Sequence, residues 1–295
     1  MTERVEIPAA ARERLARMGS GEATAFSSAL SVGEALSVRE AGLEPIAQVM
    51  GVSYYKVGWQ GLPYGSYGGG GGLFGSGGRQ GQTVELNQQS DAWNDARRLA
   101  VGRLLEEAHA AGADAVVGVQ VRRHLRDWAT DLVEFVAVGT AVRSTRYELA
   151  LNGGGPVLSN LSGQDVAKLA KHGFWPVGIV GGSTVAYVIS SWSQTRRSAG
   201  LFSSMQNQEL PDFTRGLYET RALAMAHVTR EAHELHAHGV VGVAIERKQH
   251  EREREINNTT YTDLIIEMHV LGTAIVEVEG GPQAPPQTFT SLPLN

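Results

Sequence analysis

The sequence predicts an α+β protein made of two tandem βαββ units. Each unit is a mostly antiparallel three-stranded sheet covered by one long helix and preceded by a short helix. Two observations support this prediction. The chain of 295 residues contains an internal repeat, and each copy of the repeat places a helical stripe of apolar residues between segments rich in β-branched residues.

The repeat sets the predicted domain organisation. Three blocks align without gaps and in the same order: residues 30–51 with 161–182, 85–119 with 209–243, and 134–141 with 267–274. Three collinear blocks are typical of a duplicated module. The chain then divides into a charged N-terminal helix and linker (1–25), a first unit (26–146), a linker (147–160), a second unit (161–278) and a Pro-rich tail (279–295).

A short helix and a strand open each unit. Ser31 and Ser162 are each followed three residues later by an acid, which is the spacing of a capping box. Gly42 and Gly173 favour the left-handed conformation that ends a helix. The apolar runs that follow, residues 46–59 and 177–192, are rich in Val, Tyr and Ile and favour strands.

A glycine-rich segment, residues 61–81, follows the first of these strands. Glycine loses more conformational entropy than any other residue when it is ordered, so we expect a flexible loop here. Its Gly70, Gly72 and Gly75 match G-x-G-x-x-G, but no helix start or P-loop lysine follows, so no nucleotide site is predicted. The residues assigned to the loop are Gly68, Gly70, Gly72 and Phe74.

The long helix has the clearest periodicity. Its apolar stripe in the first unit consists of Trp93, Ala96, Ala100, Leu104 and Ala108. The second unit places Leu217, Thr220, Ala224, Val228 and Ala232 at the equivalent positions. Spacings of three and four residues put each set on one helix face, which we expect to lie on the sheet.

Two β-branched segments follow each long helix. They are residues 115–121 and 132–142 in the first unit, and residues 240–245 and 264–278 in the second. The charged runs between them, 122–127 and 246–256, are interpreted as solvent-facing hairpin ends.

Composition narrows the possible functions. The 26 Lys and Arg against 31 Asp and Glu give a net charge of −5, which argues against nucleic-acid binding. The absence of cysteine removes disulfides, thiol nucleophiles and thiolate metal sites. No apolar run is long enough for a membrane span, and the charged N-terminus does not resemble a signal peptide, so a cytoplasmic protein is predicted.

Thin sheets predict self-association, because three strands under one helix leave edges that proteins normally pair or cover. Charged residues that recur in both long helices are candidate contacts between subunits, where ion pairs would set the register. They are Arg97, Glu107, Arg221 and Glu231.

The chain resembles the YbjQ-like heavy-metal-binding family, whose fold is similar to that of the dodecin subunit. The motifs that carry the resemblance are residues 49–52, Glu107–Ala108, Gly112–Val119 and Gly139–Val142. The second unit departs from the pattern at residues 236–239, which read His-Ala-His-Gly. The resemblance implies pentameric rings of βαββ units, and for a tandem chain a pseudo-decameric or two-tier ring.

Histidines near the end of the second long helix suggest a metal site. His233 and His236 share a helix face, with His238 and Glu231 close in sequence, which would suit a divalent transition metal. The alternative is a polar helix end, where a protonated histidine also suits the helix dipole.

Three functions remain open. The leading hypothesis is a non-enzymatic, ring-forming scaffold or binding protein, because no catalytic constellation is found. The alternatives are a protein that binds or sequesters divalent heavy metals, and an enzyme whose site forms only between subunits. The N-terminal segment, the glycine-rich loop and the Pro-rich tail are candidate contacts for a protein partner.

Overall fold

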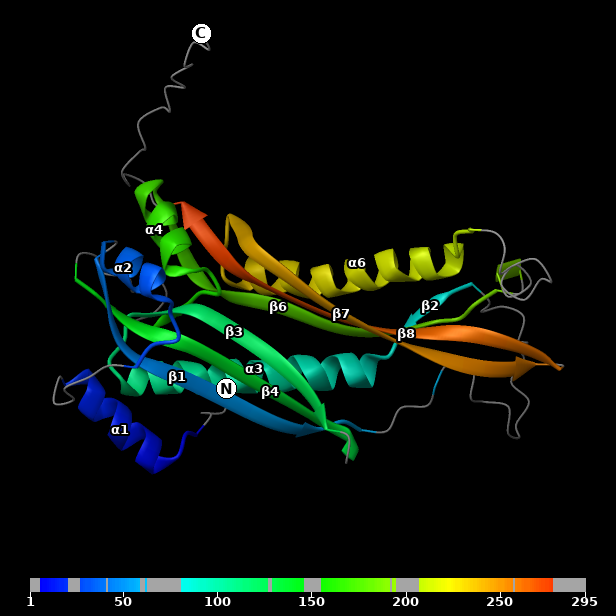
Figure 1. Cartoon of the computed structure of the whole chain (residues 1–295), viewed down its shortest axis with the longest axis horizontal. Coiled ribbons are helices and arrows are strands. Elements are labelled where there is room, and N and C mark those ends of the chain that lie inside the picture. Colours follow the sequence, from blue (N-terminus) through cyan, green and yellow to red (C-terminus); the bar gives the residue numbers. More distant parts are fainter. Residues whose placement is uncertain are drawn as a thin grey trace, which may run out of the picture.

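The computed structural model describes most of the chain (Figure 1). The described residues are 6–20, 27–40, 42–58, 62, 81–126, 129–145, 155–191, 193–194, 207–256 and 258–277. The predicted loop residues Gly68, Gly70, Gly72 and Phe74, and the tail at 279–295, lie outside this part. The observed architecture is α+β with two mostly antiparallel sheets, which confirms the predicted class.

Two sets of elements repeat along the chain. The first comprises α1 (Ala9–Gly19), α2 (Val32–Glu40), β1 (Leu43–Lys56), β2 (Thr83–Glu85), α3 (Asn87–Ala110), β3 (Ala115–Arg126) and β4 (Ala129–Ser144). The second comprises β5 (Val157–Leu158), α4 (Gly163–Lys171), β6 (Phe174–Val188), α6 (Pro211–Glu234), β7 (Gly239–Ile256) and β8 (Thr259–Glu277). Apart from α1, which packs on α3 and β1, each element of the first set has a repeat counterpart in sequence.

The local signals at the short helices are confirmed. In α4, the Oγ of Ser162 accepts a hydrogen bond from the backbone N–H of Asp165 at 3.2 Å. Gly42 and Gly173, which follow the two helices, have φ of 78° and 77°. Only glycine adopts this left-handed conformation without strain, so the chain turns from helix into strand at these positions.

Each sheet has four strands, not the predicted three. The orders are β1-β4-β3-β5 and β2-β6-β8-β7. The additional strands are exchanged between the units: β5, from the predicted linker, pairs in parallel with β3, and β2 pairs antiparallel with β6. The correction has a physical reason, because an edge strand gains backbone hydrogen bonds from a neighbouring segment even when that segment is only two or three residues long.

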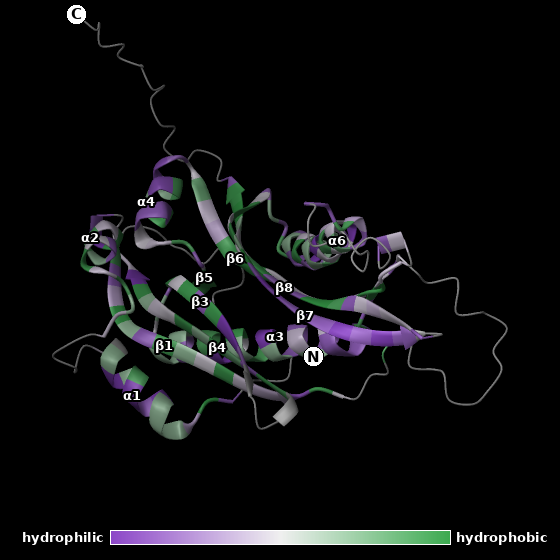
Figure 2. Cartoon of the chain, turned by 45° about the vertical axis from the view of Figure 1, so that its right-hand side comes forward, coloured by the Kyte–Doolittle hydropathy of each residue, from purple (hydrophilic) through white to green (hydrophobic). Residues whose placement is uncertain are grey.

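The long hairpin strands extend further than expected. The charged run 246–256 forms the second half of β7, paired with β8 as far as Ile256 and Thr259. Its residues are mostly exposed, and Figure 2 shows the hydrophilic stretch along β7. The backbone pairing with β8 overrides the weak strand propensity of these charged side chains.

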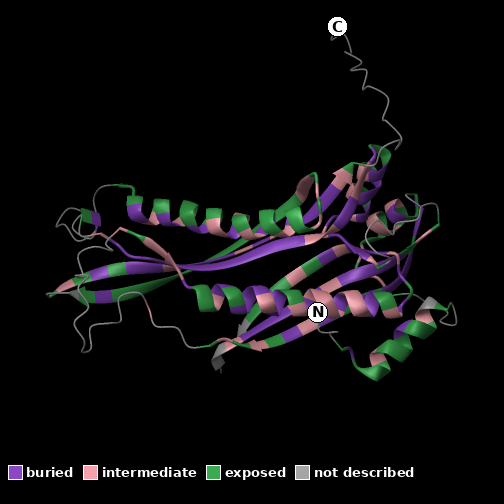
Figure 3. Ribbon diagram, turned by 180° about the vertical axis from the view of Figure 1, so that it is seen from behind, coloured by how far each residue is buried: buried purple, intermediate pink, exposed green. Residues whose placement is uncertain are grey.

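Each long helix lies close against its own sheet (Figure 3). Helix α3 packs on β1 and β4 with its predicted stripe buried, and α6 packs on β6 and β8 in the same way. A Cβ on Gly51 would overlap the carbonyl of Ala100, and one on Gly182 would overlap the carbonyl of Ala224. Both strands therefore need glycine where the helix backbone crosses them. No helix within the described ranges is long and apolar enough to cross a membrane.

Candidate functional site

Helix α3 also contacts the sheet of the second unit, and this contact forms the boundary between the units. The Nδ2 of Asn94 donates to the carbonyl of Ser183 at 2.8 Å, and the N–H of Ser183 donates to the Oδ1 of Asn94 at 2.9 Å. One turn earlier, the Oγ of Ser90 accepts from the N–H of Val185 at 3.0 Å. Polar side chains of α3 therefore continue the hydrogen-bonding of strand β6.

A buried ion pair lies beside this contact. The Nη2 of Arg97 is 2.5 Å from the Oε1 of Glu231 and also donates to the carbonyl of Gly181 at 3.0 Å. The Oε2 of Glu231 accepts from the N–H of Gly181 at 2.8 Å. Two of the predicted oligomer contacts thus meet between the units of one chain. Glu107 makes the equivalent contact in the first unit, where it accepts from the N–H of Met50 at 2.8 Å.

A second ion pair and an aromatic stack complete the boundary. The Nη2 of Arg123 is 2.6 Å from the Oε2 of Glu267. The guanidinium of Arg123 lies 4.3 Å from the ring centroid of Trp93, a cation–π contact. On the same indole, the ring of His269 stacks at 5.1 Å between centroids. Residues from α3, β3 and β8 therefore interlock across the two units.

A cavity of about 400 Å³ lies beside the stack, lined by both units. Its polar lining includes Arg97, Arg123, Ser183 and His269. Three buried atoms in this lining lack a hydrogen-bond partner among the described residues: the Nε of Arg97, the Nη1 of Arg123 and the Nε2 of His269. The cavity has the size and the polar groups needed to bind ordered water or a small polar molecule.

His269 is electrically neutral near neutral pH. Desolvation lowers its pKa well below the ordinary value of 6.5, and the charges of Arg123 and Arg97 lower it further. The ring borders the cavity, so part of its surface is accessible although protein atoms surround it. Its Nδ1 lies 2.8 Å from the Oγ of Ser183. A hydrolytic triad would need an acid on Nε2, which has no such partner in the described part of the chain.

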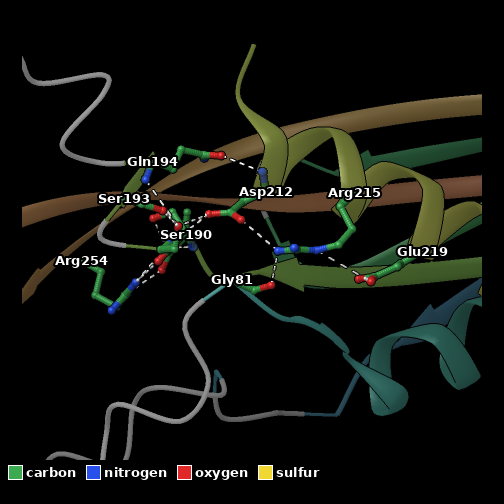
Figure 4. Close-up of polar contacts among 10 residues, drawn as sticks. Gly81, Ser190, Ser193, Gln194, Asp212, Arg215, Glu219 and Arg254 are labelled. Atoms are coloured by element: carbon green, nitrogen blue, oxygen red, sulfur yellow. Dashed lines mark hydrogen bonds and ion pairs between the residues drawn. The ribbon is translucent and has the colours of Figure 1, made fainter. Parts of the chain in front are cut away.

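A different polar cluster joins the first unit to the start of α6 (Figure 4). Asp212 accepts from the N–H of Ser191 at 2.8 Å and is paired with Arg215 at 2.9 Å. Arg215 also donates to the carbonyl of Gly81. Buried Asp263 accepts from the Nε of Arg254 at 2.7 Å. Because these carboxylates are satisfied by protein donors, the cluster is structural.

The predicted metal ligands have different surroundings in the structure. Glu231 faces Arg97, His233 and His236 are exposed, and the Nδ1 of His238 accepts from the N–H of Glu277 at 3.1 Å. No group of three or more His, Asp or Glu side chains in the described ranges is arranged to hold a metal ion. Metal binding by this set stays a prediction.

Sequence reasoning missed most of the boundary. Trp93 was assigned to the core of its own unit, and Arg123 to a solvent-facing hairpin end. His269 lies within the segment 264–278, for which the sequence predicted a strand and no functional role. A charged or imidazole side chain at an inward position of an apolar strand was the available signal, but it does not identify the partner.

Comparison with known proteins places the chain in a family. The family model described as "Putative heavy-metal-binding", YbjQ_1, matches residues 76–145 and 175–278, one segment in each unit. The chain belongs to the YbjQ family. The two matches agree with the tandem duplication inferred from the repeat.

Relatives of this YbjQ protein include long and short chains. The Encapsulin nanocompartment protein Rv1762c of Mycobacterium tuberculosis is 37% identical over 259 residues, which is 87% of either chain. A UPF0145 protein of Clostridium perfringens is 36% identical over 58 residues, covering 20% of this chain and 53% of that protein. No solved structure gives a significant match.

The Arg97 ion pair predicts a stability difference within one helix. We expect Arg97→Ala to lower the free energy of unfolding by about 3 kcal/mol, because Glu231 would keep its charge in a mostly buried position without its partner. The control is Arg98→Ala, whose side chain is 52% exposed and, among the residues that the structure describes, forms an ion pair with Asp95 alone. This control should cost less than about 1 kcal/mol in urea denaturation. Equal losses would contradict the role given to Arg97.

The depressed pKa of His269 predicts acid sensitivity. The unfolded chain binds a proton on this histidine below about pH 6.5, whereas the folded chain does not, so stability falls as the pH drops through that value. We expect His269→Gln to have a smaller loss of unfolding free energy between roughly pH 7.5 and 5. The control is His109→Gln, at an exposed position. An unchanged pH dependence in His269→Gln would refute this assignment.

The metal hypothesis predicts a mass increment. After incubation with Zn²⁺, Ni²⁺ or Cu²⁺, native mass spectrometry should detect bound metal on the intact chain, and the double variant His233→Ala, His236→Ala should lose it. The matched control replaces His109 and His124, two exposed histidines of the first unit. Absence of metal from the unmodified protein, or equal metal in both double variants, would reject the site.

Proposed function

We propose that this YbjQ protein is a non-enzymatic, self-associating scaffold protein, a building block of a larger protein assembly in the cytoplasm. The observation that carries the proposal is that each sheet ends in one long edge strand. Strand β1 forms one edge of the first sheet and β7 one edge of the second, and neither has an outer neighbour in the described part of the chain. Proteins normally pair or cover long edge strands of this kind.

The relatives support the same reading. The protein of Mycobacterium tuberculosis that matches along most of this chain is named an encapsulin nanocompartment protein. We infer that this chain also works within an assembly, and a closed ring of βαββ units is its expected form. A single ring that contains both units of every chain has an even number of units, whereas in a two-tier ring each chain contributes one unit to each tier.

Self-association is tested by native mass spectrometry of untagged protein, checked by light scattering at micromolar concentration. We expect a discrete multiple of 31.6 kDa, and a five- or tenfold multiple for rings of the predicted kind. A multiple other than these would correct the ring size and keep the scaffold function. A monomer at all concentrations would overturn the proposal.

A further inference from the structure

We propose that a second copy of this chain docks head to tail, so that its first unit binds the second unit of the preceding copy. The contacts are those that already join the two units within one chain. This inference rests on the proposed self-association and adds the surfaces and their order.

The sheet edges give the first argument. Within the chain, β6 is covered by β2, and β3 is covered by β5. By the repeat, the counterpart of β6 is β1 and the counterpart of β3 is β7, and these are the two edge strands without an outer neighbour in the described part of the chain. The segments that correspond to β2 and β5 are also present, at residues 207–209 and just before α2. A second copy therefore supplies each open edge with the segment that the internal boundary uses.

The segment before α2 is already held in the required geometry. The Oγ1 of Thr140 accepts from the N–H of Ala29 at 3.0 Å, as the Oγ1 of Thr273 accepts from the N–H of Asn160 at 3.0 Å. In the second unit this anchor presents Ser159, which bonds to the backbone of β3 on both sides at 2.9 and 3.0 Å. Ser28 is the counterpart of Ser159, so β7 of the preceding copy is its expected partner.

Exposed apolar side chains mark the same surfaces. Among the described residues they are Val32, Leu36, Met50 and Tyr54 in the first unit, and Tyr218, Val243 and Ile245 in the second. Their repeat counterparts are Gly163, Ala167, Gly181, Val185, Asn94, Val119 and Val121. These counterparts are buried, except for half-buried Val121. Val243, for example, is 42% exposed whereas Val119 is 2% exposed. The internal boundary therefore covers one member of each repeat pair, and the other member is exposed on the outer face of its unit.

A groove on the second unit fits the short helix of the next copy. It has a volume of about 400 Å³ and is lined by Leu161, Leu169, Val241 and Gly242. In the first unit the equivalent place is filled by α4, which packs on α2 so closely that a Cβ on Gly163 would overlap Val38. The counterpart of Gly163 is Val32, so the docked helix must sit slightly further out and place an apolar side chain in the groove.

Charge complementarity repeats as well. The internal ion pair joins Arg97 of the first unit to Glu231 of the second. Its repeat equivalent joins Arg221 of one copy to Glu107 of the next. Arg221 is exposed and makes no ion pair in the described part of the chain. Of the two carboxylate oxygens of Glu107, Oε2 accepts a hydrogen bond from the N–H of Met50, and Oε1 accepts none among the described residues. The predicted oligomer contacts therefore form two equivalent pairs, one inside the chain and one between chains.

Cysteine cross-linking tests the order of the copies, because the chain has no cysteine of its own. Val84 lies opposite Tyr187 where β2 pairs with β6, and the repeat equivalents are Gln208 and Lys56, both exposed. Directly opposite positions on antiparallel strands bring Cβ atoms within about 5.5 Å. We expect mild oxidation of Lys56→Cys, Gln208→Cys to give a ladder of linked chains on a denaturing gel.

The single variants are the matched controls. Neither Lys56→Cys nor Gln208→Cys should cross-link alone, whereas co-expression of the two should give linked pairs that contain one of each. Cross-linking of one single variant with itself would show a two-fold contact and overturn the head-to-tail order. Absence of the ladder in a double variant that keeps the native assembly mass would also overturn it and leave the scaffold function standing. If the unmodified protein is a monomer, both the head-to-tail order and the scaffold function are wrong.

A charge reversal gives an independent result. Arg221→Glu would face Glu107 across the new contact, so we expect the assembly to dissociate toward smaller multiples of the chain. Arg98→Glu changes the same charge at an exposed position of α3 and should keep the assembly mass. If both variants keep the native mass, the surface around Arg221 is not the contact.

Discussion

Helix α3 is buried on two sides, and the arrangement of the two units depends on it. One face carries the small apolar residues that pack on β1 and β4, and another carries Asn94 and Arg97, which bond to β6 of the second unit. Pulling the units apart would expose Trp93 and leave the Arg97 and Glu231 charges unpaired. Such losses cost several kcal/mol, so the two units act as one body.

Because the two units are repeats of each other, the second long helix is expected to be buried on two sides as well. Helix α6 is the repeat of α3, and its outward face carries Tyr218 and Arg221 with no sheet over it in the described chain. Under the proposed head-to-tail docking, the sheet of the next copy covers this face. Contacts that are head to tail close into a ring when the rotation between units allows it.

The internal boundary has features that the repeat does not reproduce. Trp93 corresponds to Leu217 and His269 to Val136, so the stacked pair with Arg123 and its neighbouring cavity belong to the boundary within the chain. At these positions the boundary within the chain carries a tryptophan and a histidine where the repeat has leucine and valine.

The sequence was sufficient for the features that depend on neighbouring residues. The capping boxes at Ser31 and Ser162, the glycines that end the short helices and the helical stripes act over a few residues, and their pattern is readable without a partner. The order of elements and the tandem units followed from the repeat. Only the tertiary structure decided that β2 and β5 change units, that Arg97 meets Glu231 and that Trp93 stacks on His269. These contacts join residues far apart in the chain, and the type of a residue does not specify which distant residue will lie beside it.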